Sequence, residues 1–154
     1  MYEHFQARVA GTTIDGGTLL STDYFNNFNE VIMLLGILPE MPEMIEEIRA
    51  WQFCTYQEHF GGSGLPFAPL AIEAYAHVPP VIRDRFEQTI AEMHVTVDEA
   101  RETLVRLASE AELDRFKLTA VDYSIRLQGL VDAGSAIVHG VGEVSDQDAI
   151  DALF

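Results

Sequence analysis

The chain has 154 residues, a hydrophobic content of 48%, and 25 acidic against 9 basic side chains, for a net charge of −16. This length suits one domain with a buried core, and the hydrophobic content argues against disorder. The excess of acids repels phosphate backbones and anionic lipid, so the sequence predicts no nucleic-acid partner and no membrane partner.

The N-terminal residues 1–20 are rich in glycine and threonine, and we predict an irregular arm there, with a short extended piece around residues 7–10. A first helix is expected from the N-cap candidates at Ser21 and Asp23 to about Leu38. Its apolar face has helical spacing and consists of Phe25, Phe28, Ile32 and Leu35.

Pro39 ends the first helix, and Pro42 suits the first turn of a second one. We expect the second helix to continue without a break to the Gly61-Gly62 pair. Its apolar residues are Ile45, Ile48, Trp51, Phe53 and Tyr56. A glycine- and proline-rich loop over residues 61–69 follows, and then a short helix over residues 70–77.

Two longer helices give the clearest structural signal, because apolar residues recur in each at alternating four- and three-residue spacing, as in a heptad seam. The first seam is Phe86, Ile90, Met93, Val97, Ala100, Leu104 and Leu107, and the second is Phe116, Ala120, Tyr123, Leu127, Leu130, Gly134 and Ile137. Ser109-Glu-Ala-Glu112 between them has the pattern of a capping box, which predicts a turn and an antiparallel hairpin. In that hairpin Gly134 is expected near Phe86.

The sequence therefore predicts an all-α fold: an antiparallel bundle of four main helices plus a short helix, with a long C-terminal helical hairpin and a short amphipathic tail helix. The expected organisation is an arm over 1–20, a bundle over 21–140 and a tail over 141–154. A seam this regular also suits pairing between two chains, so a homodimer is an open alternative. One cysteine, Cys54, and no recognisable signal peptide favour a cytoplasmic protein.

Acidic and histidine side chains one helical turn apart raise the question of metal binding. Glu73 and His77 form one such pair, and His94 and Asp98 form another. Two isolated pairs do not make a coordination set, and the Glu-x-x-His motif of ferritin-like di-iron proteins is absent. We favour solvated helix faces, with a metal- or cofactor-binding bundle as an alternative, and the sequence identifies no cofactor.

Asp23 and Asn27 place an acid and an amide one turn apart at the start of the first predicted helix. Such a pair can hold a metal-bound aspartyl phosphate and orient a water molecule toward it. Polar side chains near a helix start more commonly cap and solvate the helix, which is the interpretation we favour. An aspartyl-phosphate phosphatase is the alternative.

The C-terminal segment from Val144 to Phe154 has the pattern of an acidic amphipathic helix. Ser145 is a candidate N-cap, and Ile150, Leu153 and Phe154 fall on one helical face. A helix this short is marginal alone in water and needs a surface to fold against. The pattern is typical of a peptide that docks as a helix in a groove.

This segment resembles the CheY-docking peptides of bacterial chemotaxis, namely the C-terminal peptide of the CheZ phosphatase and the N-terminal peptide of the flagellar switch protein FliM. The matching positions are Gln147, Ile150, Asp151 and Leu153. The resemblance implies a cytoplasmic interaction protein that docks a CheY-like receiver domain through its tail. The partner-binding residues would be Gln147, Asp148, Ile150, Asp151, Leu153 and Phe154.

The second long predicted helix departs from CheZ, because it lacks an Asp-x-x-x-Gln pair: Asp122 is followed one turn later by Arg126, and Asp132 by Ala136. The resemblance therefore implies docking and leaves dephosphorylation as an alternative. A further alternative is that the apolar residues of the tail pack back onto the chain's own bundle.

Overall fold

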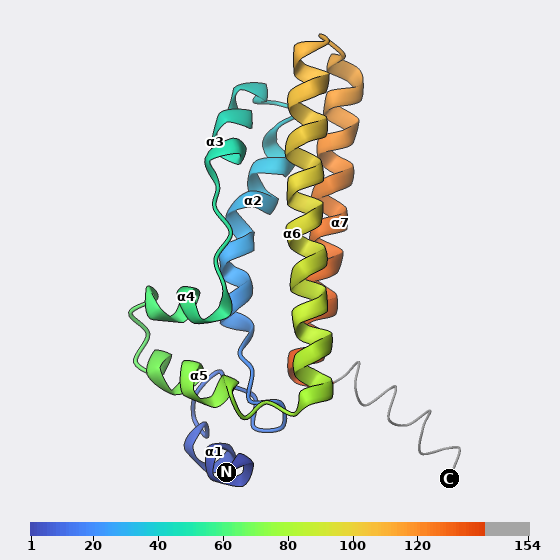
Figure 1. Cartoon of the computed structure of the whole chain (residues 1–154). Helices are drawn as coiled ribbons and strands as arrows, with labels where there is room; N and C mark the ends of the chain where they lie inside the picture. Colours follow the sequence, from blue (N-terminus) through green and yellow to red (C-terminus); the bar gives the residue numbers. More distant parts are fainter. Residues whose placement is uncertain (141–154) are drawn as a thin grey trace, which may run out of the picture.

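A computed structural model describes residues 1–140 of the protein, and these residues are all-helical, as predicted (Figure 1). They form seven α-helices and two short 3₁₀ helices. The elements are α1 (Tyr2–Arg8), η1 (Thr22–Phe25), α2 (Asn26–Ile37), η2 (Pro42–Met44), α3 (Ile45–Ala50), α4 (Tyr56–Gly61), α5 (Ala68–Tyr75), α6 (Pro80–Ser109) and α7 (Leu113–His139).

The predicted hairpin is present: α6 and α7 run antiparallel along the length of the molecule, with a turn where it was expected (Figure 1). The predicted capping box is wrong. The Ser109 hydroxyl donates to the carbonyl of Arg106 at 2.7 Å, and Glu112, the N-cap of α7, makes no capping bond with its side chain. Ala111 takes a left-handed conformation with φ 56° and reverses the chain instead.

The first seam is buried as predicted, apart from the half-buried Ile90. The second seam is followed as far as Leu127 and again at Gly134, but Val131 and Val138 are buried in place of their neighbours Leu130 and Ile137, which are half-buried. A straight α-helix drifts relative to a seven-residue repeat. The N-terminal part of the chain also covers the shifted face, because the Thr18 hydroxyl donates to the carbonyl of Val138 at 2.7 Å.

Gly134 of α7 lies against a large side chain, as the seam predicted, but that side chain is Phe25 of η1. A Cβ built on Gly134 would lie 2.5 Å from Cζ of the Phe25 ring. Phe25 is only 3% exposed, and its ring centroid is 5.8 Å from that of Phe86. Phe25 therefore lies close to both Gly134 and Phe86, and the absence of a side chain at Gly134 allows η1 to approach α7 closely.

The prediction of an extended piece near residues 7–10 is wrong, because the chain begins with a helix, α1. Phe5 and Val9 are buried, and the Phe5 ring stacks on His77 with centroids 4.5 Å apart. Phe5 and Val9 are spaced i, i+4 and so lie on one helical face. The N-terminal residues belong to the main core, which includes Ile14, Leu19 and Leu20.

The predicted second helix is also wrong as a single element, because it is divided into η2, α3 and α4 with an extended segment at residues 51–55. The long helices are thus α2, α6 and α7. Helix α2 packs on α7, where the Ser124 hydroxyl donates to the carbonyl of Ile32 at 3.2 Å, and α3 packs on α6. Helices α4 and α5 pack together near the end remote from the hairpin turn (Figure 1). No helix within residues 1–140 is long and apolar enough to cross a membrane.

Candidate functional site

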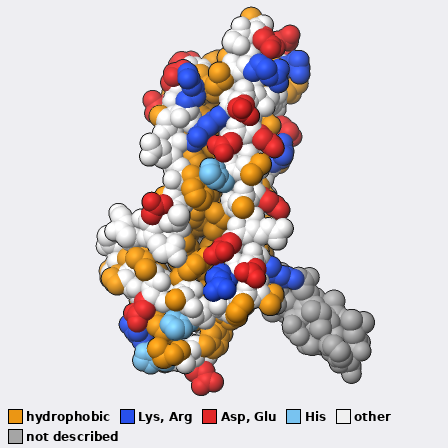
Figure 2. Space-filling model, viewed as in Figure 1, with side chains coloured by type: hydrophobic (Ala, Val, Ile, Leu, Met, Phe, Trp, Pro, Cys, Tyr) orange, Lys and Arg blue, Asp and Glu red, His pale blue; other side chains and the backbone are white. Residues whose placement is uncertain are grey.

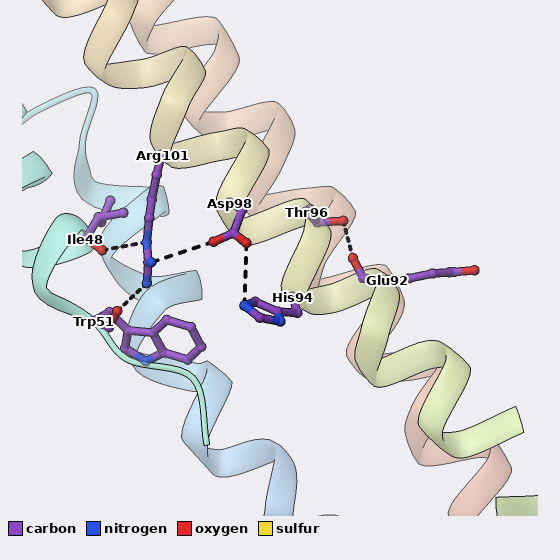
Figure 3. Close-up of polar contacts among 7 residues, drawn as sticks. All are labelled: Ile48, Trp51, Glu92, His94, Thr96, Asp98 and Arg101. Atoms are coloured by element: carbon purple, nitrogen blue, oxygen red, sulfur yellow. Dashed lines mark hydrogen bonds and ion pairs between the residues drawn. The ribbon is translucent and has the colours of Figure 1, made fainter. Parts of the chain in front are cut away.

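The extended segment 51–55 is held in place by Arg101 of α6. Helix α3 stops at Trp51, which has φ −62° and ψ 135°. Arg101 Nε donates to the carbonyl of Ile48 at 3.1 Å, and Arg101 Nη2 donates to the carbonyl of Trp51 (Figure 3). Carbonyls at a helix end lack the regular intrahelical donors. Arg101 supplies donors for two carbonyls there, and the Ile48 carbonyl also accepts a bond from the Trp51 amide at 3.3 Å. The arginine side chain therefore fixes where α3 ends.

Asp98 of α6 lies between the Arg101 clamp and His94, whose ring contacts Phe53 of the extended segment. Its carboxylate lies 3.8 Å from Arg101 Nη1 and 3.5 Å from His94 Nε2 (Figure 3). The His94 ring in turn stacks on Phe53, with centroids 4.4 Å apart and an interplanar angle of 4°. In the same turns of α6 the Thr96 hydroxyl donates to the carbonyl of Glu92 at 2.7 Å. Because of the stacking on His94, the Phe53 ring lies flat against α6.

The segment ends in a capping box that starts α4. The Glu58 amide donates to the Thr55 hydroxyl at 3.1 Å, and the Thr55 amide donates to the Glu58 carboxylate at 2.8 Å. This reciprocal pair satisfies two amides at the start of the helix. It places the next side chain, Tyr56, in the core at 3% exposure.

Between the segment and α6 lies a cleft of about 220 Å³. Figure 2 shows hydrophobic side chains gathered in a hollow between α6 and the chain that joins α3 to α4. Tyr24 and Tyr56 are buried beneath it, while Phe53 and Tyr75 are half-buried. The lining residues are Tyr24, Phe53, Thr55, Tyr56, Gln57, Tyr75, Glu87 and Ile90.

Hydrogen bonds fix the three tyrosines of the cleft. Tyr24 donates to the carbonyl of Cys54 at 2.8 Å, the Ser21 amide donates to the Tyr56 hydroxyl at 3.0 Å, and Tyr75 donates to the Glu87 carboxylate at 2.5 Å. Because each hydroxyl already has a partner, the rings are held in fixed orientations. The cleft is therefore a preformed aromatic surface with one carboxylate at its edge.

The charge around the cleft is negative. Burial raises the pKa of Tyr24, Tyr56 and Tyr75 well above its ordinary value near 10.0, so these hydroxyls are neutral at physiological pH. Nearby carboxylates raise the same pKa values further. Glu58 acts on Tyr24, Asp23 on Tyr56 and Glu87 on Tyr75.

Two other groups near the segment are also affected by burial. Burial raises the pKa of the Cys54 thiol, so this cysteine is not an activated nucleophile. Burial lowers the pKa of His59, against the opposing effect of Asp23, which favours the neutral imidazole. Cys54 therefore lacks the environment of a catalytic nucleophile, and His59 lacks that of a charged imidazolium.

The predicted docking residues lie outside the described residues, which end at Gly140. Their predicted role in partner docking therefore depends on the sequence alone. They are Gln147, Asp148, Ile150, Asp151, Leu153 and Phe154.

Asp23 and Asn27, the alternative phosphatase pair, take different partners. The Asp23 carboxylate accepts hydrogen bonds from Thr13 at 2.7 Å and from Asn26 at 3.3 Å. Asn27 lines a separate surface hollow beside Trp51, and its buried side-chain nitrogen has no hydrogen-bond partner among the described residues. Asp23 and Asn27 thus have different neighbours among the described residues, and their catalytic role stays a prediction.

The two candidate metal pairs also differ. Glu73 forms an ion pair with Arg8 at 3.2 Å, and His77 stacks on Phe5, so these side chains are directed to separate partners. His94 and Asp98 do lie together, as described above. Within the part of the chain that the structure describes, no group of three or more histidine, cysteine or acidic side chains is placed to hold a metal ion.

Sequence reasoning missed the cleft, because it assigned Phe53 and Tyr56 to one continuous helix. A local signal was present: Thr55-Tyr-Gln-Glu58 matches a capping box and predicts a helix start between those two aromatic residues. Tyr75 and Glu87 have no such signal, because their hydrogen bond joins two elements that only the tertiary fold brings together.

No protein-family model, no curated protein and no solved structure matches this chain.

Proposed function

We propose that the protein is an adaptor whose helical body presents the acidic segment 141–154 to a receiver domain of the CheY type. The observation that carries this proposal is the sequence of that segment. Acids flank Ile150, Leu153 and Phe154, which would share one face of a short helix. The proposal includes a cytoplasmic location, where receiver domains act and where a single cysteine stays reduced.

The end of α7 at Gly140 supports a division of the chain into a folded body and a separate docking segment. Gly140 has φ 78°, and its amide bonds back to the carbonyl of Ile137 at 3.1 Å, which is a common way to end a helix. The large buried core of the described residues extends from Phe5 to Val138. A chain that stops at Gly140 retains all of these core residues, so we expect it to fold.

The binding energy is expected to come from a few apolar anchors. Truncating an anchor at the centre of an interface typically costs more than about 1 kcal/mol. Ile150→Ala and Leu153→Ala should therefore each weaken binding at least about fivefold. Asp148 and Asp151 would face basic side chains of the receiver, and added salt should weaken the complex by screening these pairs.

The test is a set of fluorescence-anisotropy titrations of receiver domains, with and without beryllium fluoride as a phosphoryl mimic. The full chain, the Leu153→Ala variant and the Ala152→Ser variant are compared. We expect Leu153→Ala to bind weakly and Ala152→Ser, which lies off the anchor face, to bind like the parent chain. Equal binding of all three proteins would remove the proposed anchors.

Asn27 favours one second candidate, dephosphorylation of the bound receiver. Its side-chain amide is buried without a hydrogen-bond partner among the described residues, which is an unfavourable arrangement that a ligand would relieve. The expected result is that Asn27→Ala slows loss of the receiver's phosphoryl group while leaving the affinity of the two proteins unchanged. An unchanged rate of dephosphorylation would eliminate this activity.

We also propose that two copies of the chain associate through the outer face of α7. Leu118, Val121 and Ile125 on this face are 74%, 42% and 66% exposed. Helix α7 carries three acidic and three basic side chains and so is neutral overall, in a chain with a net charge of −16. A second copy meets little charge repulsion on this neutral helix, which is why we assign the apolar face to self-association.

A further inference from the structure

The cleft between residues 51–55 and α6 collects aromatic rings from four separate parts of the chain. Tyr24 comes from η1, Phe53 from the extended segment, Tyr56 from α4 and Tyr75 from α5. The ring centroids of Tyr24 and Tyr56 are 5.5 Å apart, and those of Tyr56 and Tyr75 are 4.8 Å apart. Tyr24 and Tyr56 are buried beneath the cleft, and the half-buried Phe53 and Tyr75 offer it most of the accessible ring surface. The faces of aromatic rings are electron-rich.

The charge near these rings selects the kind of ligand. Carboxylates of Glu58, Asp23 and Glu87 act on the three tyrosines, whereas Arg83 acts on Tyr75 with the opposite sign. An anion would meet this excess of negative charge and would be repelled. A metal ion would find rings where it needs oxygen, nitrogen or sulfur ligands.

We propose that this cleft binds a small organic cation of the alkylammonium class, with its alkyl groups on the aromatic rings and its charge near the Glu87 carboxylate. Aromatic rings attract cations that are weakly hydrated, and cages of such rings recognise quaternary ammonium groups. Glu87 accepts a hydrogen bond from Tyr75 on one oxygen and supplies the balancing charge at the rim. The cleft volume, about 220 Å³, suits one small molecule.

The framework around the cleft makes it a preformed site. Phe53 is stacked on His94, and the segment that carries it is fixed by the Arg101 clamp at one end and by the Thr55–Glu58 capping box at the other. The rings therefore do not have to reorganise when a ligand enters, which reduces the entropic cost of binding. This ligand site is independent of the proposed docking segment.

The primary test is isothermal titration calorimetry of the full chain with choline, with tetramethylammonium and with the uncharged isostere 3,3-dimethyl-1-butanol. We expect both cations to bind, and the neutral alcohol to bind at least about tenfold more weakly, because it lacks the cation–π attraction. Equal binding of choline and the alcohol would show an unselective apolar pocket and overturn the proposal, as would the absence of heat with both cations.

Variants of the lining identify the site. Phe53→Leu keeps an apolar side chain but removes the ring, and Glu87→Gln removes the charge; each should weaken choline binding about tenfold. Glu92→Gln removes a charge from a separate hollow between α6 and α7 and should bind choline like the parent chain. Thermal unfolding establishes that each variant is folded. Unchanged choline affinity in both cleft variants contradicts the proposal, whatever the receiver-binding experiments show.

Discussion

Gly129 and Gly134 both lie in the interior of α7, but a side chain would have free space at Gly129 and would collide with a neighbour at Gly134. Replacing each glycine with alanine therefore gives a matched test of the packing. At Gly129 an added Cβ meets nothing within 4 Å. Glycine in the middle of a helix is less stable than alanine by about 0.5–1 kcal/mol. Gly129→Ala should therefore raise the free energy of unfolding by about that amount.

At Gly134 the same gain is opposed by a collision. The added Cβ would lie 2.5 Å from Cζ of Phe25 and 3.0 Å from Cε1. The Phe25 ring is itself confined by Tyr24 and Phe86, each with its centroid 5.8 Å from that of Phe25. Overpacking a filled core costs about 1–3 kcal/mol, so Gly134→Ala should lower the free energy of unfolding by about 0.5–2 kcal/mol after the helix gain is subtracted.

Urea unfolding followed by circular dichroism measures both variants, and their midpoints should move in opposite directions. A Gly134→Ala protein as stable as Gly129→Ala would refute the close approach of η1 to α7. The double variant Gly134→Ala, Phe25→Leu supplies the control. Its destabilisation should be smaller than the sum of the two single effects by about 1 kcal/mol, because the shortened side chain makes room for the new methyl group.

Three further predictions test the clamp, the tyrosines and the dimer face. Arg101→Met should lower the free energy of unfolding by about 1–3 kcal/mol in a urea titration, because two part-buried carbonyls lose the bonds that the guanidinium donates. An unchanged midpoint would contradict the clamp. The three cleft tyrosines, of which Tyr75 is half-buried, have pKa values raised above 10.0. Their contribution to stability is therefore fully present below pH 10 and falls as unfolded tyrosines ionise above it. Absorbance at about 295 nm should therefore show Tyr24, Tyr56 and Tyr75 ionising only on unfolding, and ionisation of all tyrosines in the folded protein near pH 10 would contradict their burial. Light scattering should give the parent chain a mass of twice 17.2 kDa, and Ile125→Glu should reduce it to that of one chain. The control Val81→Glu, at an exposed position on α6, should remain a dimer. A monomeric parent chain would exclude the dimer.

The α6–α7 hairpin was predictable from the sequence because a heptad seam depends on local spacing. The shift to Val131 and Val138 was not, because it reflects which neighbour covers the end of α7. The same distinction explains the divided second helix. Apolar spacing predicted one helix from Pro42 to Gly61, but the donors of Arg101, distant in the sequence, capture the carbonyls at which α3 ends.

The candidate sites follow the same rule. The docking segment stays a prediction from the sequence, because its acids, cap and anchors lie within eleven consecutive residues outside the described part of the chain. The aromatic cleft could not, because Tyr24, Phe53 and Tyr75 come from separate elements and meet only in the folded chain. Glu73 and His77 had the spacing of a ligand pair, yet they are directed to Arg8 and Phe5 by the packing of α1, an element the sequence analysis had not predicted.

The most direct test of the adaptor proposal separates the segment from the body. A labelled peptide of residues 141–154 and a chain ending at Gly140 are each titrated with the receiver domain that the full chain binds. The proposal predicts that the peptide binds within about tenfold of the full chain, since the anchors lie within it, and that the truncated chain does not bind while its circular dichroism stays helical. A folded truncated chain that retains full affinity would contradict it.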